Sequence, residues 1–161
     1  MTTANRSLVF SDGFVISCGT VTVDLAASKV LLIRSRGTGE CYLPKGRKDI
    51  GESLQDAALR ETWEETGVHA HLLPVPITTR ATVPTATAAA GGRMTNGVLK
   101  VIFWFVAAAD STATRDNGTQ QEDEDFDALW VGWDEVRSTL TFEDDGQIAE
   151  AALVAAKATM R

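Results

Sequence analysis

The residues best suited to chemistry are three glutamates on one short predicted helix. Glu61, Glu64 and Glu65 fall within residues 53–66, a segment whose pattern predicts a helix that ends at Gly67. Successive residues of a helix are rotated by about 100° around its axis. If Glu61 is placed at zero, Glu65 lies at about 40° and Glu64 at about 300° around this axis. The same stripe contains the small and apolar residues Leu54, Ala57 and Ala58. The three carboxylates are therefore predicted to face the interior.

An inward orientation of these glutamates is costly without a cation. Like charges three or four positions apart destabilise a helix by roughly a few tenths of a kcal/mol each. Burial adds a desolvation cost and raises the pKa of a carboxyl group unless positive charge compensates. Clustered carboxylate oxygens suit Mg²⁺ or Mn²⁺, which keep bound waters and bridge to phosphate oxygens. We therefore predict a Mg²⁺ or Mn²⁺ site, with Arg60 and Trp63 projecting away from it.

The spacing around the glutamates resembles the motif of a known family. Residues 46–68 read Gly46, five residues, Glu52, seven residues and then Arg60-Glu61-Thr62-Trp63-Glu64-Glu65-Thr66-Gly67-Val68. This segment matches the Nudix box, G-x5-E-x7-R-E-U-x-E-E-x-G-U, at each invariant position. One departure is Thr62, where the family has a bulky apolar residue. The resemblance implies a Nudix fold of the α+β class, an α/β/α sandwich with a mixed β-sheet between helices, as a single Nudix hydrolase domain over residues 1–161.

Carried over position by position, the resemblance implies a role for each residue of the motif. The metal ligands are expected to be Glu61, Glu64, Glu65 and the backbone carbonyl of Lys45. The residues expected to take part in catalysis are Glu61, Glu64, Glu52 and Arg60. Glu61 is the candidate for activating the attacking water, and Glu52 is expected to pair with Arg60, which positions a catalytic glutamate. Gly46 lets the backbone approach closely where the loop meets the helix.

A later acidic segment offers further candidates. Many Nudix enzymes add an acidic ligand or base from a loop that follows the motif. The candidates here are Glu122, Asp123, Glu124 and Asp125. We retain Glu122 and Glu124 as the extra acid or base, and a solvated acidic loop is the alternative for each. The sequence does not choose among them.

Positive charge gathers just before the motif. Residues 29–48 contain six basic side chains and one acidic side chain, whereas the whole chain has a net charge of −7. A local basic cluster in an acidic protein suits a small, highly anionic ligand, and stable binding of nucleic acid is not expected. The candidate substrate-binding residues are Arg34, Arg36, Lys45, Gly46, Arg47 and Lys48. A solvated basic loop is the alternative interpretation.

Two features bear on the choice of substrate. Residues 43–46, Leu-Pro-Lys-Gly, and the core of the motif are similar to eukaryotic hydrolases of diphosphoinositol polyphosphates and diadenosine polyphosphates. Arginine forks and lysine charges also suit a ligand with many phosphates. We therefore expect hydrolysis of a phosphoanhydride bond in one of these two substrates. The alternatives are a house-cleaning pyrophosphatase of nucleoside triphosphates or nucleoside diphosphate derivatives, an mRNA-decapping hydrolase, which the acidic charge disfavours, and a Nudix module that binds ligands without turnover.

Composition sets the remaining limits. A chain of 161 residues with 44% hydrophobic residues can bury one substantial core. Its longest apolar run, residues 101–109, is far shorter than the roughly 20 residues that a membrane-spanning helix needs. Cys18 and Cys41 lack a metal-ligand spacing, and no secretory signal is evident. We therefore expect free thiols in a reducing compartment, the cytoplasm or the nucleus. The oligomeric state is not indicated.

The hydrophobic pattern predicts the elements that must position the site. Strands are predicted at Phe14–Val23, Val30–Ile33, Val68–Leu73, Val98–Ala108 and Ala128–Trp133. The fourth of these should be central because it is apolar on both faces. Helices are predicted at Ser53–Thr66, Asp134–Leu140 and Glu143–Met160. The last helix should bury Ile148, Ala151, Ala152 and Ala155. Loops are predicted at Thr78–Gly97 and Ser111–Asp125.

Overall fold

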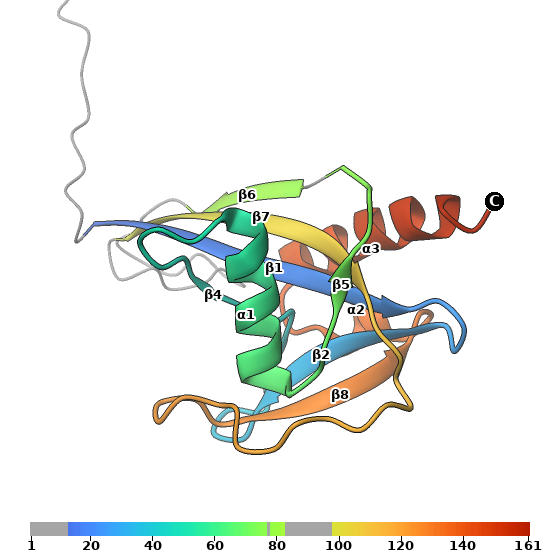
Figure 1. Ribbon diagram of the computed structural model, residues 1–161, viewed down its shortest axis with the longest axis horizontal. Helices are drawn as coiled ribbons and strands as arrows, with labels where there is room; N and C mark the ends of the chain where they lie inside the picture. Colours follow the sequence, from blue (N-terminus) through green and yellow to red (C-terminus); the bar gives the residue numbers. More distant parts are fainter. Residues whose placement is uncertain (1–12, 77, 83–97) are drawn as a thin grey trace, which may run out of the picture.

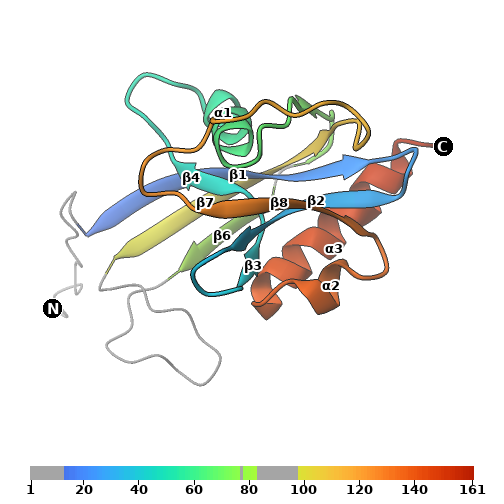
Figure 2. The same cartoon turned by 90° about the horizontal axis from the view of Figure 1, so that it is seen from below.

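A mixed sheet separates one helix from two others (Figures 1 and 2). This computed structural model describes residues 13–76, 78–82 and 98–161. The strands are β1 (Phe14–Asp24), β2 (Lys29–Ser35), β3 (Cys41–Tyr42), β4 (Lys45–Arg47), β5 (His71–Leu72), β6 (Thr78–Thr82), β7 (Leu99–Ala108) and β8 (Phe126–Gly132). The helices are α1 (Leu54–Thr66), α2 (Val136–Thr139) and α3 (Glu143–Ala158). The predicted α/β/α sandwich is confirmed.

The strand β7 is an interior strand of the sheet, paired along both of its edges. It runs parallel to β1 from the pair Phe14–Leu99 to the pair Val23–Ala108, and its other edge pairs with β5 and β6. Its side chains alternate between two cores. Ile102, Trp104 and Val106 pack with the residues of α3, and Phe105 packs with those of α1. Burial on both faces explains why this segment is almost continuously apolar, as predicted.

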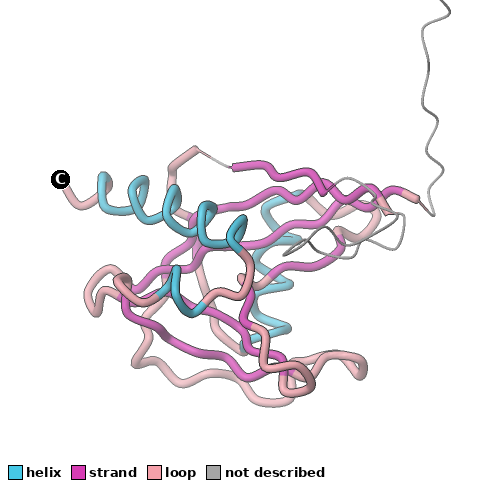
Figure 3. The backbone as a smooth tube through the Cα atoms, turned by 180° about the vertical axis from the view of Figure 1, so that it is seen from behind, coloured by secondary structure: helices cyan, strands magenta, loops and turns pink. Residues whose placement is uncertain are grey.

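The helices cover opposite faces of this sheet. Figure 2 shows α1 on one side and α2 and α3 on the other, and Figure 3 shows α3 from behind as it crosses the sheet. None of the helices in the described ranges is both long and apolar enough to cross a membrane.

The sheet splits between β1 and β2, and the site lies next to this split. The two strands pair only at Val23–Val30 and Asp24–Lys29, after which β3 pairs with β2 and β4 pairs with β1. The close approach of β4 to β1 requires a glycine at position 19. A Cβ atom there would lie 2.5 Å from the carbonyl oxygen of Pro44 and 2.6 Å from the ring of Trp104.

Local signals set both ends of α1, as predicted. The Ser53 hydroxyl accepts a hydrogen bond from the backbone N–H of Asp56 at 3.0 Å, which satisfies one free donor of the first turn. Gly67 adopts a left-handed φ of 72°, and its N–H donates to the Trp63 carbonyl at 2.7 Å. A Cβ atom at Gly67 would also lie 2.1 Å from the carbonyl oxygen of Asp116. Glycine is therefore required there both by backbone conformation and by packing.

The motif's one departure, Thr62, joins α1 to β1 through buried hydroxyl groups. Thr62 donates to the Ala58 carbonyl at 2.8 Å, so its oxygen must accept from the Thr20 hydroxyl, 2.7 Å away. The Thr20 oxygen in turn accepts from Thr22 at 2.7 Å. All three threonines are fully buried. An apolar residue at position 62 would leave the Thr20 hydroxyl without this acceptor.

Three predicted elements differ from the structure. Residues Thr78–Thr82, predicted as loop, form β6, an edge strand that pairs antiparallel with β7. The rest of the predicted loop, residues 83–97, lies outside the described residues. The predicted strand Val68–Leu73 is reduced to β5. In α3, Ala151 is exposed, and the buried stripe is Ile148, Ala149, Ala152, Leu153 and Ala156.

The hydroxyl chain generates a stability prediction. Thr62→Val keeps the side-chain shape but removes the acceptor for Thr20, so we expect a loss of about 1–2 kcal/mol in the free energy of unfolding. Thr20→Val together with Thr62→Val should lose less than the sum of the two single variants, because the two hydroxyls are coupled. Chemical denaturation measures all three, with Thr114→Val on an exposed loop as the control. Strict additivity would contradict the predicted coupling.

Candidate active site

Three carboxylates from two segments converge beside α1. Glu61 and Glu64 come from the helix, and Glu124 comes from the loop that precedes β8. One oxygen of each lies within 4.8 Å of the others. Glu61 is only 6% exposed, and the other two are half-buried. Oxygen ligands grouped in this way could hold a hard divalent cation such as Mg²⁺ or Mn²⁺.

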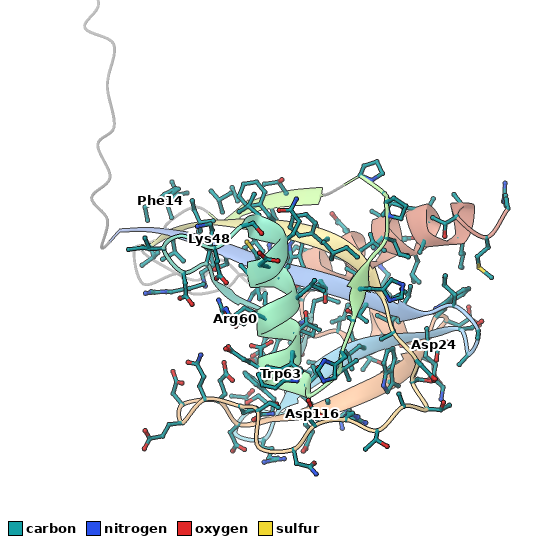
Figure 4. The ribbon with its side chains drawn as sticks, in the orientation of Figure 1. Phe14, Asp24, Lys48, Arg60, Trp63 and Asp116 are labelled. Carbon is teal, nitrogen blue, oxygen red and sulfur yellow. The ribbon has the colours of Figure 1, made fainter. Side chains whose placement is uncertain are left out.

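Arg60 lies at the centre of this acidic cluster. Its Nη1 donates to Glu61 Oε1 at 2.8 Å and to Glu64 Oε2 at 3.0 Å. Its Nε and Nη2 donate to the two oxygens of Glu52 at 3.1 and 2.7 Å. The prediction that Arg60 projects away from the glutamates is wrong, because its long side chain turns back along the helix. Figure 4 shows Arg60 beside α1, with Trp63 and Asp116 at the far end of the helix.

Burial determines the protonation of the site when no cation is bound. It raises the pKa of Glu61 to about 7, although the hydrogen bond and charge of Arg60 act in the opposite direction. It also raises the pKa of Glu65 well above its usual range, and Lys45 only partly opposes this. The pKa of Glu52 is lowered, chiefly by its hydrogen bond from Arg60. A divalent cation would favour the charged forms of the buried carboxyls.

The strand β4 passes directly against the glutamates. The backbone N–H of Lys45 donates to Glu65 Oε2 at 3.0 Å, which ties Glu65 to this strand beside the three converging carboxylates. A Cβ atom at Gly46 would lie 2.0 Å from Glu61 Oε2. Glycine at this position therefore leaves the space that the Glu61 carboxylate occupies. The Lys45 peptide lies at the site, as the predicted carbonyl ligand requires.

The loop carrying Glu124 is fastened to the C-terminal half of α1. The Thr119 hydroxyl donates to the Glu64 carbonyl at 2.8 Å, and the Gln120 amide donates to the Glu65 carbonyl at 2.9 Å. The Gln121 amide donates to Glu64 Oε2 at 3.1 Å. These bonds bring Glu124 to the cluster, whereas Glu122 is exposed and lies outside it.

A second contact holds the same loop at the end of α1. Asp116 accepts from the indole N–H of Trp63 at 2.9 Å and lies 2.7 Å from the His69 ring nitrogen Nε2. These hydrogen bonds lower the pKa of Asp116, with the bond from Trp63 as the largest cause. Sequence reasoning missed this contact because nothing local pairs a tryptophan with an aspartate 53 residues later.

The predicted basic residues are not gathered into one patch. Arg36 pairs with Asp125 at 2.9 Å and Asp127 at 2.8 Å, and it lines a cleft of about 730 Å³ beneath the Glu124 loop. Arg34 donates from Nε to the Cys41 sulfur at 3.4 Å. Arg47 and Lys48 line a different groove, and Lys45 and Gly46 lie at the carboxylates. Much of the expected positive charge at Arg36 is therefore neutralised within the protein.

Solved structures with a similar fold include a NUDIX hydrolase from Nitrosomonas europaea, with a TM-score of 0.61 and 22% identity over 91% of this chain and 90% of that one. A C. elegans Ap4A hydrolase in a binary complex has a TM-score of 0.66 and 19% identity, over 88% of this chain and 98% of that one. At these identities the likeness concerns the fold.

Comparisons of the sequence give evidence for the family as well as the fold. The protein named MutT4 from Mycobacterium tuberculosis (strain CDC 1551 / Oshkosh) is 29% identical over 120 residues, which are 68% of this chain and 40% of that protein. This chain therefore spans less than half the length of that relative. The family model described as the NUDIX domain matches residues 16–152, which is most of the sequence. The chain belongs to the NUDIX domain family.

Proposed function

We propose that this protein is a divalent-metal-dependent hydrolase of phosphoanhydride bonds. The observation that carries this proposal is the convergence of Glu61, Glu64 and Glu124 within 4.8 Å beside a partly buried arginine. Nudix enzymes act on pyrophosphate bonds in small phosphorylated compounds and use divalent metals. This chain retains every charged residue of the family motif.

Each residue of the site has a proposed task. When bound, Mg²⁺ or Mn²⁺ would neutralise phosphate charge and lower the pKa of a coordinated water. Arg60 engages Oε1 of Glu61 and Oε2 of Glu64, which leaves one oxygen of each carboxylate for the metal or a water. Glu52 accepts from Nε and Nη2 of Arg60 and so fixes the direction of the guanidinium.

Glu61 is the proposed base for the attacking water. Arg60 and a bound cation would keep its carboxyl group ionised, and so able to accept a proton from the water. The Lys45 N–H occupies Oε2 of Glu65, which leaves its other oxygen for the metal-ligand role that the family motif implies. We propose that Glu65 also positions the Lys45 carbonyl as a ligand, while Glu124 supplies the additional acidic group from the loop.

The proposed substrate is a dinucleoside polyphosphate such as a diadenosine polyphosphate. Arg36 is engaged by two aspartates, which weakens the charge argument for a diphosphoinositol polyphosphate. The structural likeness to a protein named as an Ap4A hydrolase supports the nucleotide. Nucleoside triphosphates and nucleoside diphosphate derivatives are the second candidate. A module that binds ligands without turnover is the alternative from another class.

A substrate panel tests this proposal. Purified protein is incubated with Mg²⁺ or Mn²⁺ and diadenosine tetraphosphate, a diphosphoinositol polyphosphate, nucleoside triphosphates and ADP-ribose, and products are identified by mass spectrometry. Glu64→Gln should lower kcat at least about 100-fold, since even outer partners of metal sites contribute about 10- to 100-fold. Glu122→Gln, an exposed neighbour outside the cluster, should keep activity. A wild-type protein that binds these ligands but converts none would support the binding module.

The contact between Gly46 and Glu61 generates a second prediction. Gly46→Ala should lower kcat by roughly 10- to 100-fold, because the new methyl group displaces the Glu61 carboxylate by more than the site tolerates. The fold should survive, since the displaced atoms end a flexible side chain. Gly37→Ala, where a methyl group meets only the Ser35 hydroxyl at 3.8 Å, is the matched control. Unchanged kcat in Gly46→Ala, with thermal unfolding also unchanged, would contradict the role of Glu61.

The raised pKa values predict how stability depends on pH. Between about pH 4.5 and 7 the metal-free folded protein holds the Glu61 proton, whereas the unfolded chain has lost it. The free energy of unfolding should therefore fall as pH rises through this window. Saturating Mn²⁺ should oppose the fall, because it binds the ionised carboxylates of the folded state. Calorimetry with and without Mn²⁺ measures both curves. Glu61→Gln should flatten the metal-free curve, and an unaltered slope in this variant would contradict the assignment.

A further inference from the structure

Exposed apolar side chains gather at one groove beside the carboxylates. The large hydrophobic residues that the described chain leaves exposed are Phe14, Ile16, Ile50, Val154 and Met160. The first three line a single groove of about 480 Å³, whereas the other two lie at the C-terminal end of the chain. Phe14 is 37% exposed, Ile16 is 38% exposed and Ile50 is fully exposed. Such a cluster indicates a binding surface more strongly than scattered apolar residues do.

The groove follows from how β1 extends beyond α1. Side chains alternate along a strand, so Phe14 and Ile16 lie on the same face as Cys18. Cys18 is buried under Ala57 and Ala58 of α1, but the two earlier residues lie past the start of the helix. The N–H of Lys48 donates to the Ile16 carbonyl at 3.0 Å, which holds the loop after β4 beside this uncovered part of the strand.

The groove is adjacent to the candidate active site. The carbonyl of Arg47 accepts from Arg60 Nη2 at 2.9 Å, and Gly46, the preceding residue, contacts the Glu61 carboxylate. Asp49, also in the lining, lies 3.6 Å from Arg60 Nη2. Figure 4 shows Phe14 and Lys48 near the same end of α1, above Arg60. A ligand in the groove would therefore lie next to the carboxylate cluster, because Arg47 in the lining directly follows Gly46 in the sequence.

The charge of the lining suits an anionic ligand that carries an apolar ring. Arg47 and Lys48 take part in none of the ion pairs found among the described residues, whereas the one acidic lining residue, Asp49, is directed at Arg60. The volume lies within the usual range for small-molecule sites, about 300–1,000 Å³. A nucleoside phosphate combines an apolar base with adjoining negative charge, and both features have counterparts in this groove.

We propose that this groove binds the nucleoside of a nucleoside polyphosphate, with the base against Phe14, Ile16 and Ile50 and a phosphate near Arg47 and Lys48. This inference rests on the proposed hydrolase activity and names the part of the substrate that lies next to the cleaved bond. The apolar lining disfavours a diphosphoinositol polyphosphate as the ligand of this groove. Its ring carries phosphates around its edge and has no apolar face comparable to a nucleobase.

The test compares a substrate that has bases with one that lacks them. The double variant Phe14→Ser with Ile50→Ser should raise KM for diadenosine tetraphosphate roughly five- to tenfold, because the base loses its apolar contact. Its kcat, and both parameters for inorganic tripolyphosphate, should stay unchanged. Val154→Ser, an exposed apolar residue of α3, is the matched control and should alter neither substrate.

Other outcomes would overturn the inference without affecting the proposed activity. Equal increases in KM for both substrates would show a general distortion, and unchanged KM for the dinucleotide would show that the base lies elsewhere. A wild-type dimer that the double variant dissociates in sedimentation velocity would instead assign the groove to contact between copies of this chain. If the wild type cleaves neither substrate, the proposed hydrolase activity is wrong. Calorimetric titration with ATP then tests the groove separately. Weaker ATP binding by the double variant would support the nucleoside site, and equal binding would overturn it.

Discussion

The contact of one guanidinium with three carboxylates is the interaction on which the site depends. Arg60 bonds Glu52, Glu61 and Glu64 within 3.1 Å, so a single positive charge faces three negative ones, with Glu124 close by. Burial is the main cause of the raised pKa of Glu61, and the negative charges of Glu64 and Glu124 add to it. A dication would balance this charge.

The rest of the fold can be understood as support for this cluster. The approach of β4 to the sheet depends on Gly19, and the approach of Glu61 to β4 depends on Gly46. The face of α1 toward the sheet is built from small residues, and a hydroxyl chain through Thr62 and Thr20 joins it to β1. Because the apolar contact beneath α1 is modest, these directional contacts fix where its carboxylates point.

The parts of the site that the sequence predicted are those governed by local periodicity. The inward stripe of α1, its caps and the doubly covered strand β7 all follow from spacings within one element. The path of a long side chain does not, so the direction of Arg60 was predicted wrongly. The choice of Glu124 over Glu122 was also inaccessible, because it depends on where Gln120 and Gln121 meet α1, some 55 residues earlier in the chain.

The arrangement around Arg47 links ligand binding to the geometry of the carboxylates. Its carbonyl oxygen orients Arg60, and its side chain lines the apolar groove. Since both belong to one residue at the end of β4, a ligand that moves this backbone must also move the guanidinium that holds Glu61 and Glu64. Strand β4 is paired with β1 from Ser17 to Gly19, which limits such movement. A ligand that fits without shifting β4 would therefore keep the carboxylates in place, and the groove would select substrates by shape as well as by charge.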